Sequence, residues 1–323
     1  MKPARLRLVP VFAALTAAIT AAVSSCNEDT EPPVIDGELA LRYAQENYDL
    51  GPKVFRTEGA MRSAEWIMSV ANTMKGLEKA GGNIRVVTNM TGNPPVVCNV
   101  EIAFPGPTDD FIVVGAHHDT KRLFSVPDFA GANDGASGVG ALLAMARACV
   151  EYMYMQMQTR PLPCGIRFVF FDGEEALYQY TETDGLVGSR TYIDELRRDG
   201  DLERCRAMIL LDMIGDKDLH IELAGNSTPA LADAVMAAAK ASGYADKFSR
   251  GSTDMLDDHY PFLQAKIPAV DLIDFSYGPD NCYWHTEADT MDKISAESIK
   301  TAADVALRTV WRLAATGFKD LPK

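Results

Sequence analysis

The chain contains little histidine, tryptophan and cysteine, and it lacks an excess of positive charge. Its 323 residues include 5 His, 3 Trp and 6 Cys, and the formal net charge is -14 at pH 7. So acidic a chain is unsuited to binding nucleic acid or to direct adhesion to anionic lipid. No Cys-x-x-Cys pair occurs, which argues against a zinc site built from thiolates. Hydrophobic residues make up 47% of the chain, which is enough for a full globular core.

The first 25 residues have the parts of a secretory signal. Lys2, Arg5 and Arg7 give a basic start, an apolar run rich in alanine follows at Leu8–Val23, and small serines come next. The apolar run has about 16 residues, fewer than the roughly 20 that a transmembrane helix needs. We therefore expect residues 1–25 to be a signal peptide and not a membrane span.

A cysteine follows the predicted signal directly. Val-Ser-Ser-Cys at 23–26 resembles a bacterial lipobox, in which the cysteine carries the lipid, although an ordinary signal peptide that ends near a cysteine has the same pattern. The lipobox interpretation predicts an exported, membrane-anchored lipoprotein, periplasmic or at the cell surface. It has a lipid anchor at Cys26 and a polar tether at 26–36. Five further cysteines are an odd number, so at least one thiol stays free.

Alternating sequence patterns predict an α/β fold. Short apolar runs typical of buried strands alternate with longer stretches of helical spacing, and no later segment is long enough to divide the chain. Strands are expected at 84–89, 96–104, 111–115, 166–171, 207–211, 219–223 and 269–273, and helices at 57–80, 136–156, 186–196, 228–242 and 295–315. This order predicts a three-layer αβα sandwich with a mixed, mainly parallel central sheet, in one domain over 37–323.

Histidines and carboxylates follow the predicted buried strands. In an open α/β sheet, sites form beyond the carboxyl ends of the strands. The residues at these ends are His117, Glu174, Glu175, Asp212 and His285. Asp134 adds a carboxylate in a glycine-rich segment at the start of a predicted helix. Each alone has a structural explanation, such as a helix cap, but together these imidazoles and carboxylates predict a zinc site with one position open for substrate or water.

Five motifs in this order resemble the co-catalytic zinc aminopeptidases and their relatives, the animal-type glutaminyl cyclases. They are His117-His-Asp119, Gly131-Ala-Asn-Asp134-Gly-Ala-Ser-Gly, Asp172-Gly-Glu174-Glu175, Leu211-Asp212-Met213 and His285-Thr286. The resemblance runs from about Gly51 to the C-terminal helix. It implies a single zinc-exopeptidase-like catalytic domain.

The resemblance also implies the ligands. In the peptidases two zinc ions share the carboxylate matching Asp134. One ion also takes the residues matching Glu175 and His285, and the other takes those matching His117 and Asp212. In the cyclases only the first set holds zinc. Because all five residues are present, the resemblance implies one zinc ion or two.

Glu174 matches the general acid and base of the family. Asp119 matches an outer residue that orients His117. His117, Asp212 and Asp119 therefore belong either to a second metal site or to an outer hydrogen-bond network.

Further residues resemble the cyclases more than the peptidases. Asp257, in an acidic pair, matches a cyclase residue where peptidases more often have serine, and we expect it to hydrogen-bond Glu174. Trp284 directly precedes a ligand, and Tyr180 replaces a pocket tryptophan, so both are expected to line the substrate pocket. Asp271 departs from the pattern, because animal cyclases carry histidine there.

The first hypothesis is therefore a glutaminyl-peptide cyclotransferase, which forms pyroglutamate from N-terminal Gln of peptides or proteins and releases ammonia. Zinc acts in it as a Lewis acid and Glu174 as the proton carrier. The second is a zinc-dependent aminopeptidase with a two-zinc site. A binding protein on an inactive scaffold ranks last, because no expected ligand has been lost.

Overall fold

An eight-stranded mixed sheet forms the centre of the computed structural model, which describes residues 31–75, 85–91, 97–155 and 162–322. The strand order is β1-β2-β4-β3-β5-β8-β6-β7. The strands are β1 (Arg85–Thr91), β2 (Val97–Phe104), β3 (Phe111–His117), β4 (Gly165–Phe171), β5 (Cys205–Asp212), β6 (Ile221–Leu223), β7 (Phe248–Arg250) and β8 (Ala269–Ile273).

The middle of the sheet is parallel. Strands β4, β3, β5 and β8 run in the same direction. Strand β2 pairs antiparallel with β1 and β4, and β6 pairs antiparallel with β8 and parallel with β7. Strand β3 is buried along its whole length, as expected for a strand covered on both faces. The carboxyl ends of four adjacent strands therefore meet at one edge of the sheet.

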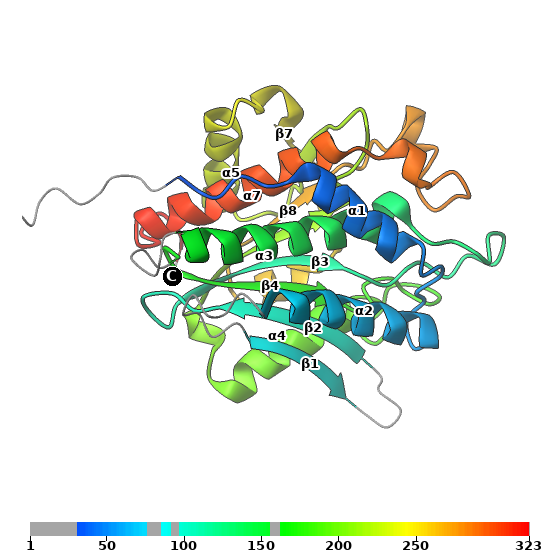
Figure 1. Cartoon of the computed structure of the whole chain (residues 1–323), viewed down its shortest axis with the longest axis horizontal. Coiled ribbons are helices and arrows are strands. Elements are labelled where there is room, and N and C mark those ends of the chain that lie inside the picture. The colour runs from blue at the N-terminus through cyan, green and yellow to red at the C-terminus, as the bar shows by residue number, and fades with distance from the viewer. Residues whose placement is uncertain (1–30, 76–84, 92–96, 156–161, 323) are drawn as a thin grey trace, which may run out of the picture. The chain divides into compact units, whose positions relative to one another are not determined.

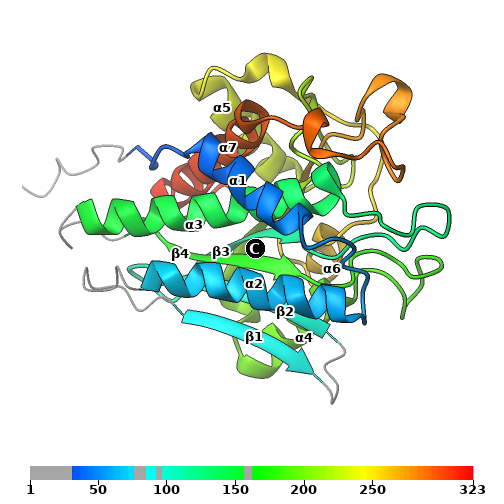
Figure 2. The ribbon, with the colours of Figure 1, turned by 45° about the vertical axis from the view of Figure 1, so that its right-hand side comes forward.

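Helices cover both faces of the sheet. They are α1 (Gly37–Tyr48), α2 (Glu58–Lys75), α3 (Gly138–Met155), α4 (Val187–Asp199), α5 (Pro229–Ala241), α6 (His259–Gln264) and α7 (Ala296–Ala315). Ile112 and Val114 of β3 pack in the core that contains α1, α2, α3, α5 and α7. Val113 packs in a second core with α4 and α6. Figures 1 and 2 show these layers, and the predicted three-layer fold is confirmed.

Helix α1 was not expected from the sequence. Asp36 caps its first turn by accepting a hydrogen bond from the amide of Leu39. Small side chains then let it approach α3 closely. A Cβ at Gly140 would lie 2.3 Å from the carbonyl oxygen of Ala40 and 2.9 Å from the amide of Ala44. The two short elements β7 and α6 were also missed.

The predicted signal peptide and the first part of the tether, 26–30 with Cys26, lie outside the described residues. The fold begins within the predicted tether, because Ile35 is buried and its amide donates to Asp304 of α7. Residues 32–323 form one compact unit. The five later cysteines are all free. Within the described residues, no helix is long and apolar enough to span a bilayer.

Candidate active site

The predicted site residues meet at the carboxyl edge of the parallel strands. His117 is the last residue of β3, and Asp212 is the last residue of β5. Glu174 and Glu175 follow β4 after a turn at Gly173, whose φ is +67°. Figures 1 and 2 show the loops that follow β3 and β4 emerging on the same side of the molecule.

Asp134, Glu175 and His285 form the first ligand set. Nε2 of His285 lies 2.9 Å from Oε1 of Glu175 and 3.1 Å from Oδ2 of Asp134. One ligand atom from each residue lies within 4.8 Å of the other two. Two of the three are buried, so the set is held by the fold and not by chance contact at the surface.

A second set shares Asp134 with the first. Nε2 of His117 lies 3.2 Å from Oδ1 of Asp134 and 3.2 Å from Oδ1 of Asp212. Asp134 therefore directs one oxygen at each histidine. The five expected ligands are brought together in the two groups that the resemblance implied.

The spacing and charge of both sets suit a small divalent cation. Two ligands at about 2.0–2.1 Å from a tetrahedral zinc lie about 3.3 Å apart, close to the observed nitrogen–oxygen distances. Burial alone would lower the pKa of His285, but Asp134 and Glu175 raise it to about 10. The pKa of His117 is likewise raised well above its usual value, against the effect of burial, by its carboxylate neighbours. The carboxylates thus favour positive charge at both positions, which a metal ion supplies.

The backbone around Asp134 is shaped for this placement. Asp134 has φ -90° and ψ 80°, and Gly135 has φ +126°. A Cβ at Gly135 would lie 3.0 Å from the ring of His117, so glycine allows the close approach. The carboxylate of Asp289 accepts hydrogen bonds from the amides of Asn133 and Asp134 at 2.8 and 3.3 Å. Asp289 was not predicted, although an acid four residues after His285 was a possible signal.

The two segments after β5 and β8 contain unusual backbone at the site. Met213, directly after Asp212, has φ +51°, and His285 itself has φ +53°. Such conformations are uncommon for residues other than glycine and persist where the surroundings fix them. The Trp284 ring stacks on His285 with centroids 4.1 Å apart and also contacts Phe275 at 4.9 Å. Trp284 therefore supports a ligand as well as facing the site.

Asp119 connects both sides of the site. Its two oxygens accept hydrogen bonds from the amides of Glu174 and Glu175 at 3.1 and 3.2 Å. Its Oδ1 lies 3.7 Å from Nδ1 of His117, which is longer than a hydrogen bond. Asp119 thus holds the turn after β4 more directly than it orients the histidine.

Glu174 contacts Tyr180. The Tyr180 hydroxyl donates to Oε1 of Glu174 at 3.0 Å. Oδ1 of Asp257, the acid expected to hydrogen-bond Glu174, accepts from the amide of Asp258. Burial, then Glu175 and Asp257, raise the pKa of Glu174 well above its usual value. The bond from Asp257 to Glu174 stays a prediction.

Behind Glu174 lies a group of buried acids. Burial raises the pKa of Asp257 and of Asp271 well above the usual range, and it raises that of Asp258 to about 7. Ser189 donates to Asp258 at 2.5 Å. Nδ1 of His259 lies 3.8 Å from Asp271. Asp271, the departure from the animal cyclases, thus faces a histidine from another part of the chain.

Two lysines that the sequence did not single out support the loops around the site. Nζ of Lys121 lies 3.0 Å from Oε2 of Glu175 and 5.2 Å from the centre of the Tyr180 ring. Lys53 is fully buried, and its Nζ donates to the carbonyl oxygen of Ala130 at 2.7 Å. Burial lowers its pKa to about 7. A lysine gives no sequence signal for such a role, because lysines are usually exposed.

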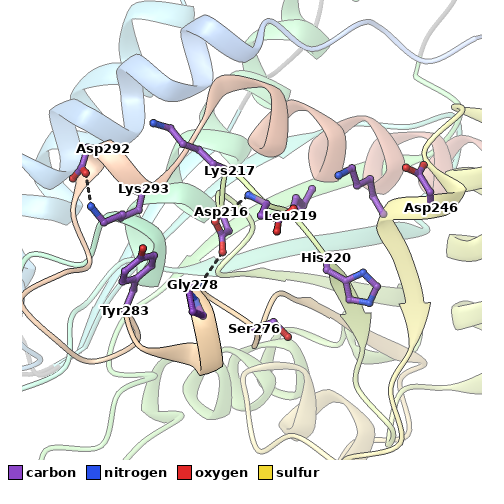
Figure 3. A pocket seen from close by; sticks show the side chains of 13 residues that line it. Asp216, Lys217, Leu219, His220, Asp246, Ser276, Gly278, Tyr283, Asp292 and Lys293 are labelled. Atoms are coloured by element: carbon purple, nitrogen blue, oxygen red, sulfur yellow. Dashed lines mark hydrogen bonds and ion pairs between the residues drawn. The ribbon is translucent and has the colours of Figure 1, made fainter.

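A pocket of about 650 Å³ lies beside this site (Figure 3). None of the predicted ligands lines it, but Tyr283, next to Trp284, forms part of its wall. Asp216 accepts a hydrogen bond from the amide of Gly278 there, and Lys293 pairs with Asp292. Lysines and aspartates alternate around the pocket, so it has no single sign of charge.

The three-layer fold, with groups of histidines and carboxylates at its carboxyl edge that could hold a metal ion, defines a class of α/β protein. The model of peptidase family M28 matches residues 99–310. The chain belongs to peptidase family M28.

Its relatives include enzymes of two kinds. The glutaminyl-peptide cyclotransferase of Drosophila melanogaster is 27% identical over 57% of this chain and 56% of the relative. The aminopeptidase YwaD of Bacillus subtilis is 28% identical over 62% of this chain and 41% of the relative. The matched part thus spans about half of these curated relatives.

Solved structures give wider coverage. The glutaminyl cyclase of an Acidobacteriales bacterium has a TM-score of 0.74 and 31% identity, over 89% of this chain and 97% of that chain. A leucine aminopeptidase precursor from Bacteroides thetaiotaomicron has a TM-score of 0.69 and 26% identity, over 86% of this chain and 98% of that chain. The chain is therefore similar to both cyclases and aminopeptidases.

Proposed function

We propose that this chain is a zinc-dependent glutaminyl-peptide cyclotransferase, which forms pyroglutamate from the N-terminal Gln of peptides or proteins. The observation that carries the proposal is the similarity to the Acidobacteriales glutaminyl cyclase over 89% of this chain. The buried carboxyl of Glu174 beside the set of Asp134, Glu175 and His285 supports it by providing a proton carrier. One zinc ion held by the first ligand set is sufficient for this chemistry.

The reaction is an internal transfer of an acyl group. The α-amine of the substrate attacks the carbonyl carbon of its own side-chain amide, a new C–N bond closes the ring, and the old C–N bond breaks. Glu174 takes a proton from the amine and passes it to the departing nitrogen, which leaves as ammonia. Zinc, when bound, polarises the amide carbonyl as a Lewis acid. Tyr180 orients Glu174, Trp284 and Tyr180 line the substrate pocket, and Asp257 helps to keep the shuttled proton nearby.

A second function, a two-zinc aminopeptidase, is favoured by one observation. The set of His117, Asp134 and Asp212 is as complete as the first and equally close. In this reaction Glu174 takes the proton of a water molecule that cleaves the first peptide bond. The buried Glu174 serves both functions, so only the products distinguish them.

Activity on two peptides distinguishes the cyclase from the aminopeptidase. The protein is incubated with zinc and a Gln-initiated or a Leu-initiated peptide, and the products are measured by mass spectrometry. Loss of one ammonia from the first and no change in the second supports the cyclase, whereas release of leucine rejects it. Glu174→Gln abolishes either activity while zinc stays bound, and Glu182→Gln, at an exposed position of the following loop, is the matched control.

We also propose that the chain is exported and anchored through a lipid on Cys26. The support is the lipobox-like sequence at 23–26. Metabolic labelling with a radioactive fatty acid tests this. The wild type is expected to take up label and to fractionate with membranes, and Cys26→Ala is expected to do neither; label retained on the variant rejects the proposal.

A further inference from the structure

Exposed apolar side chains gather on the side of the molecule that holds the site. Eight large apolar side chains are exposed in the described residues, and five of these belong to loops next to the site. The five are Phe124, Tyr178, Tyr180, Leu256 and Phe275. Single exposed apolar residues are ordinary, but a gathering of them on one side marks a binding surface.

The two most exposed of the five are Phe124, 82% exposed, and Tyr178, 77% exposed. Phe124 lies three residues after Lys121, and Tyr178 lies two residues before Tyr180. Lys121 and Tyr180 both contact Glu175. Because a chain spans at most about 3.6 Å per residue, the Cα of Phe124 lies within about 11 Å of the Cα of Lys121, and the Cα of Tyr178 lies within about 7 Å of the Cα of Tyr180. Figures 1 and 2 show the two loops side by side.

Internal hydrogen bonds hold the loop that presents Tyr178. The carboxylate of Asp184 accepts from the amides of Leu177, Tyr178 and Gln179 at 2.6, 2.9 and 3.2 Å. The amide of Thr181 donates to the carbonyl oxygen of Asp184 at 2.8 Å. The exposed position of Tyr178 is therefore set by the fold of its loop.

The loop that presents Phe124 is also held at both ends. Lys53 binds its far end through the carbonyl oxygen of Ala130, and Lys121 binds its near end to Glu175. The amide of Val126 donates to the carbonyl oxygen of Leu123, which closes a turn around Phe124. Two ordered loops thus present aromatic rings to solvent at the entrance of the site.

We propose that Phe124 and Tyr178 form a subsite for the second to fourth residues of the peptide substrate, and that this subsite takes apolar side chains. The inference rests on the proposed function, in which the N-terminal residue lies at Glu174. An extended peptide advances about 3.3 Å per residue, so these residues reach about 3–10 Å beyond the first, the range over which the two loops extend from the site. Burial of the rings against apolar side chains is favourable. The net charge of -14 adds repulsion against acidic peptides.

The test compares two amidated tetrapeptides, Gln-Phe-Leu-Gly and Gln-Gly-Gly-Gly. For the wild type we expect kcat/KM to be at least about tenfold higher for the apolar peptide, mainly through a lower KM. In the double variant Phe124→Ser/Tyr178→Ser this ratio falls to about one. The matched control is Tyr154→Ser/Met155→Ser, which removes two exposed apolar side chains from the end of α3 and keeps the ratio. An unchanged ratio in the first double variant overturns the proposal.

A binding measurement tests the subsite independently of the proposed reaction. The affinity of both peptides is measured by calorimetry on Glu174→Gln, which cannot turn them over, with and without the two serine substitutions. Tighter binding of the apolar peptide that depends on Phe124 and Tyr178 supports the subsite even if no pyroglutamate forms in the wild type. A change of molecular mass in sedimentation, seen only with the first double variant, instead assigns the surface to a second copy of the chain and overturns the subsite.

Discussion

The hydroxyl of Tyr180 donates a hydrogen bond to Oε1 of Glu174 at 3.0 Å. The loop is shaped to allow this contact, because a Cβ at Gly185 would lie 2.4 Å from the Tyr180 ring, and Gly185 has φ +82°. A residue expected as a pocket wall thus also touches the proposed proton carrier. The hydrogen bond favours the ionised form of the carboxyl, which is the form that accepts a proton.

Tyr180→Phe is expected to lower kcat roughly 10- to 100-fold, because a hydrogen bond to a charged group contributes about 1.5–3 kcal/mol. Without this bond the pKa of Glu174 rises, so the acidic limb of the pH–rate profile moves to higher pH. Steady-state kinetics across pH measure both effects. Tyr154→Phe, at an exposed tyrosine of α3 away from the site, is the control, and an equal loss in both variants would contradict the assignment.

Asp289→Asn is expected to weaken metal binding about 10- to 100-fold, which is typical for a residue that positions a ligand. Asp289 fixes the amides of Asn133 and Asp134, so its loss loosens the shared carboxylate. Competition against a coloured chelator measures the affinity. Asp292→Asn, at an exposed aspartate three residues away, is expected to change nothing; unchanged affinity in both variants rejects the role of Asp289.

The buried His259 is expected to make the protein sensitive to acid. Burial lowers its pKa from 6.5 to about 4, so the unfolded chain binds more protons between these values and stability falls as the pH drops through this range. This difference in the pKa of His259 between the folded and unfolded states corresponds to about 3 kcal/mol of stability in total.

Between pH 7 and pH 4.5, the free energy of unfolding of His259→Gln should therefore fall by about 2–3 kcal/mol less than that of the wild type. Urea unfolding at the two pH values measures this. His220→Gln removes an exposed histidine and serves as the control. The nearby acids Asp258 and Asp271 are present in every chain compared. Equal acid sensitivity in all three proteins contradicts the prediction.

Gly140→Ala is expected to destabilise the fold by about 1–3 kcal/mol, as overpacking does. In an isolated helix the same change stabilises by up to about 1 kcal/mol, so the sign of the effect is informative. The added methyl would lie 2.3 Å from the Ala40 carbonyl oxygen and push α1 away from α3. Chemical denaturation measures the change, and a more stable variant would show that α1 does not pack here.

The sequence predicts those features that depend on local pattern. Short apolar runs in the sequence predicted the positions of β3, β4, β5 and β8. Because parallel strands bring their carboxyl ends together, His117 and Asp212 could be placed at one edge of the sheet from their positions in the chain alone. The glycine-rich segment around Asp134 indicated the carboxylate that lies between the two histidines. These predictions succeeded because one short range of residues carries each signal.

Features that depend on contacts distant in sequence could not be predicted. Helix α1 is fixed by Ala40 and Ala44 against Gly140, about 100 residues away. The bond from Tyr180 to Glu174 depends on the space left by Gly185. The expected bond from Asp257 to Glu174 stays a prediction, since it depends on the protonation of two buried carboxyls about 80 residues apart.

Asp134 divides its two oxygens between His117 and His285. Ions bound at the two sets would therefore be thermodynamically linked, and an ion at one would alter the affinity of the other by a reciprocal factor. An ion held by one oxygen would order the carboxylate for the second, while the repulsion between two cations would oppose it. The side chain of Asp134 would thus set the balance between binding of one ion and of two.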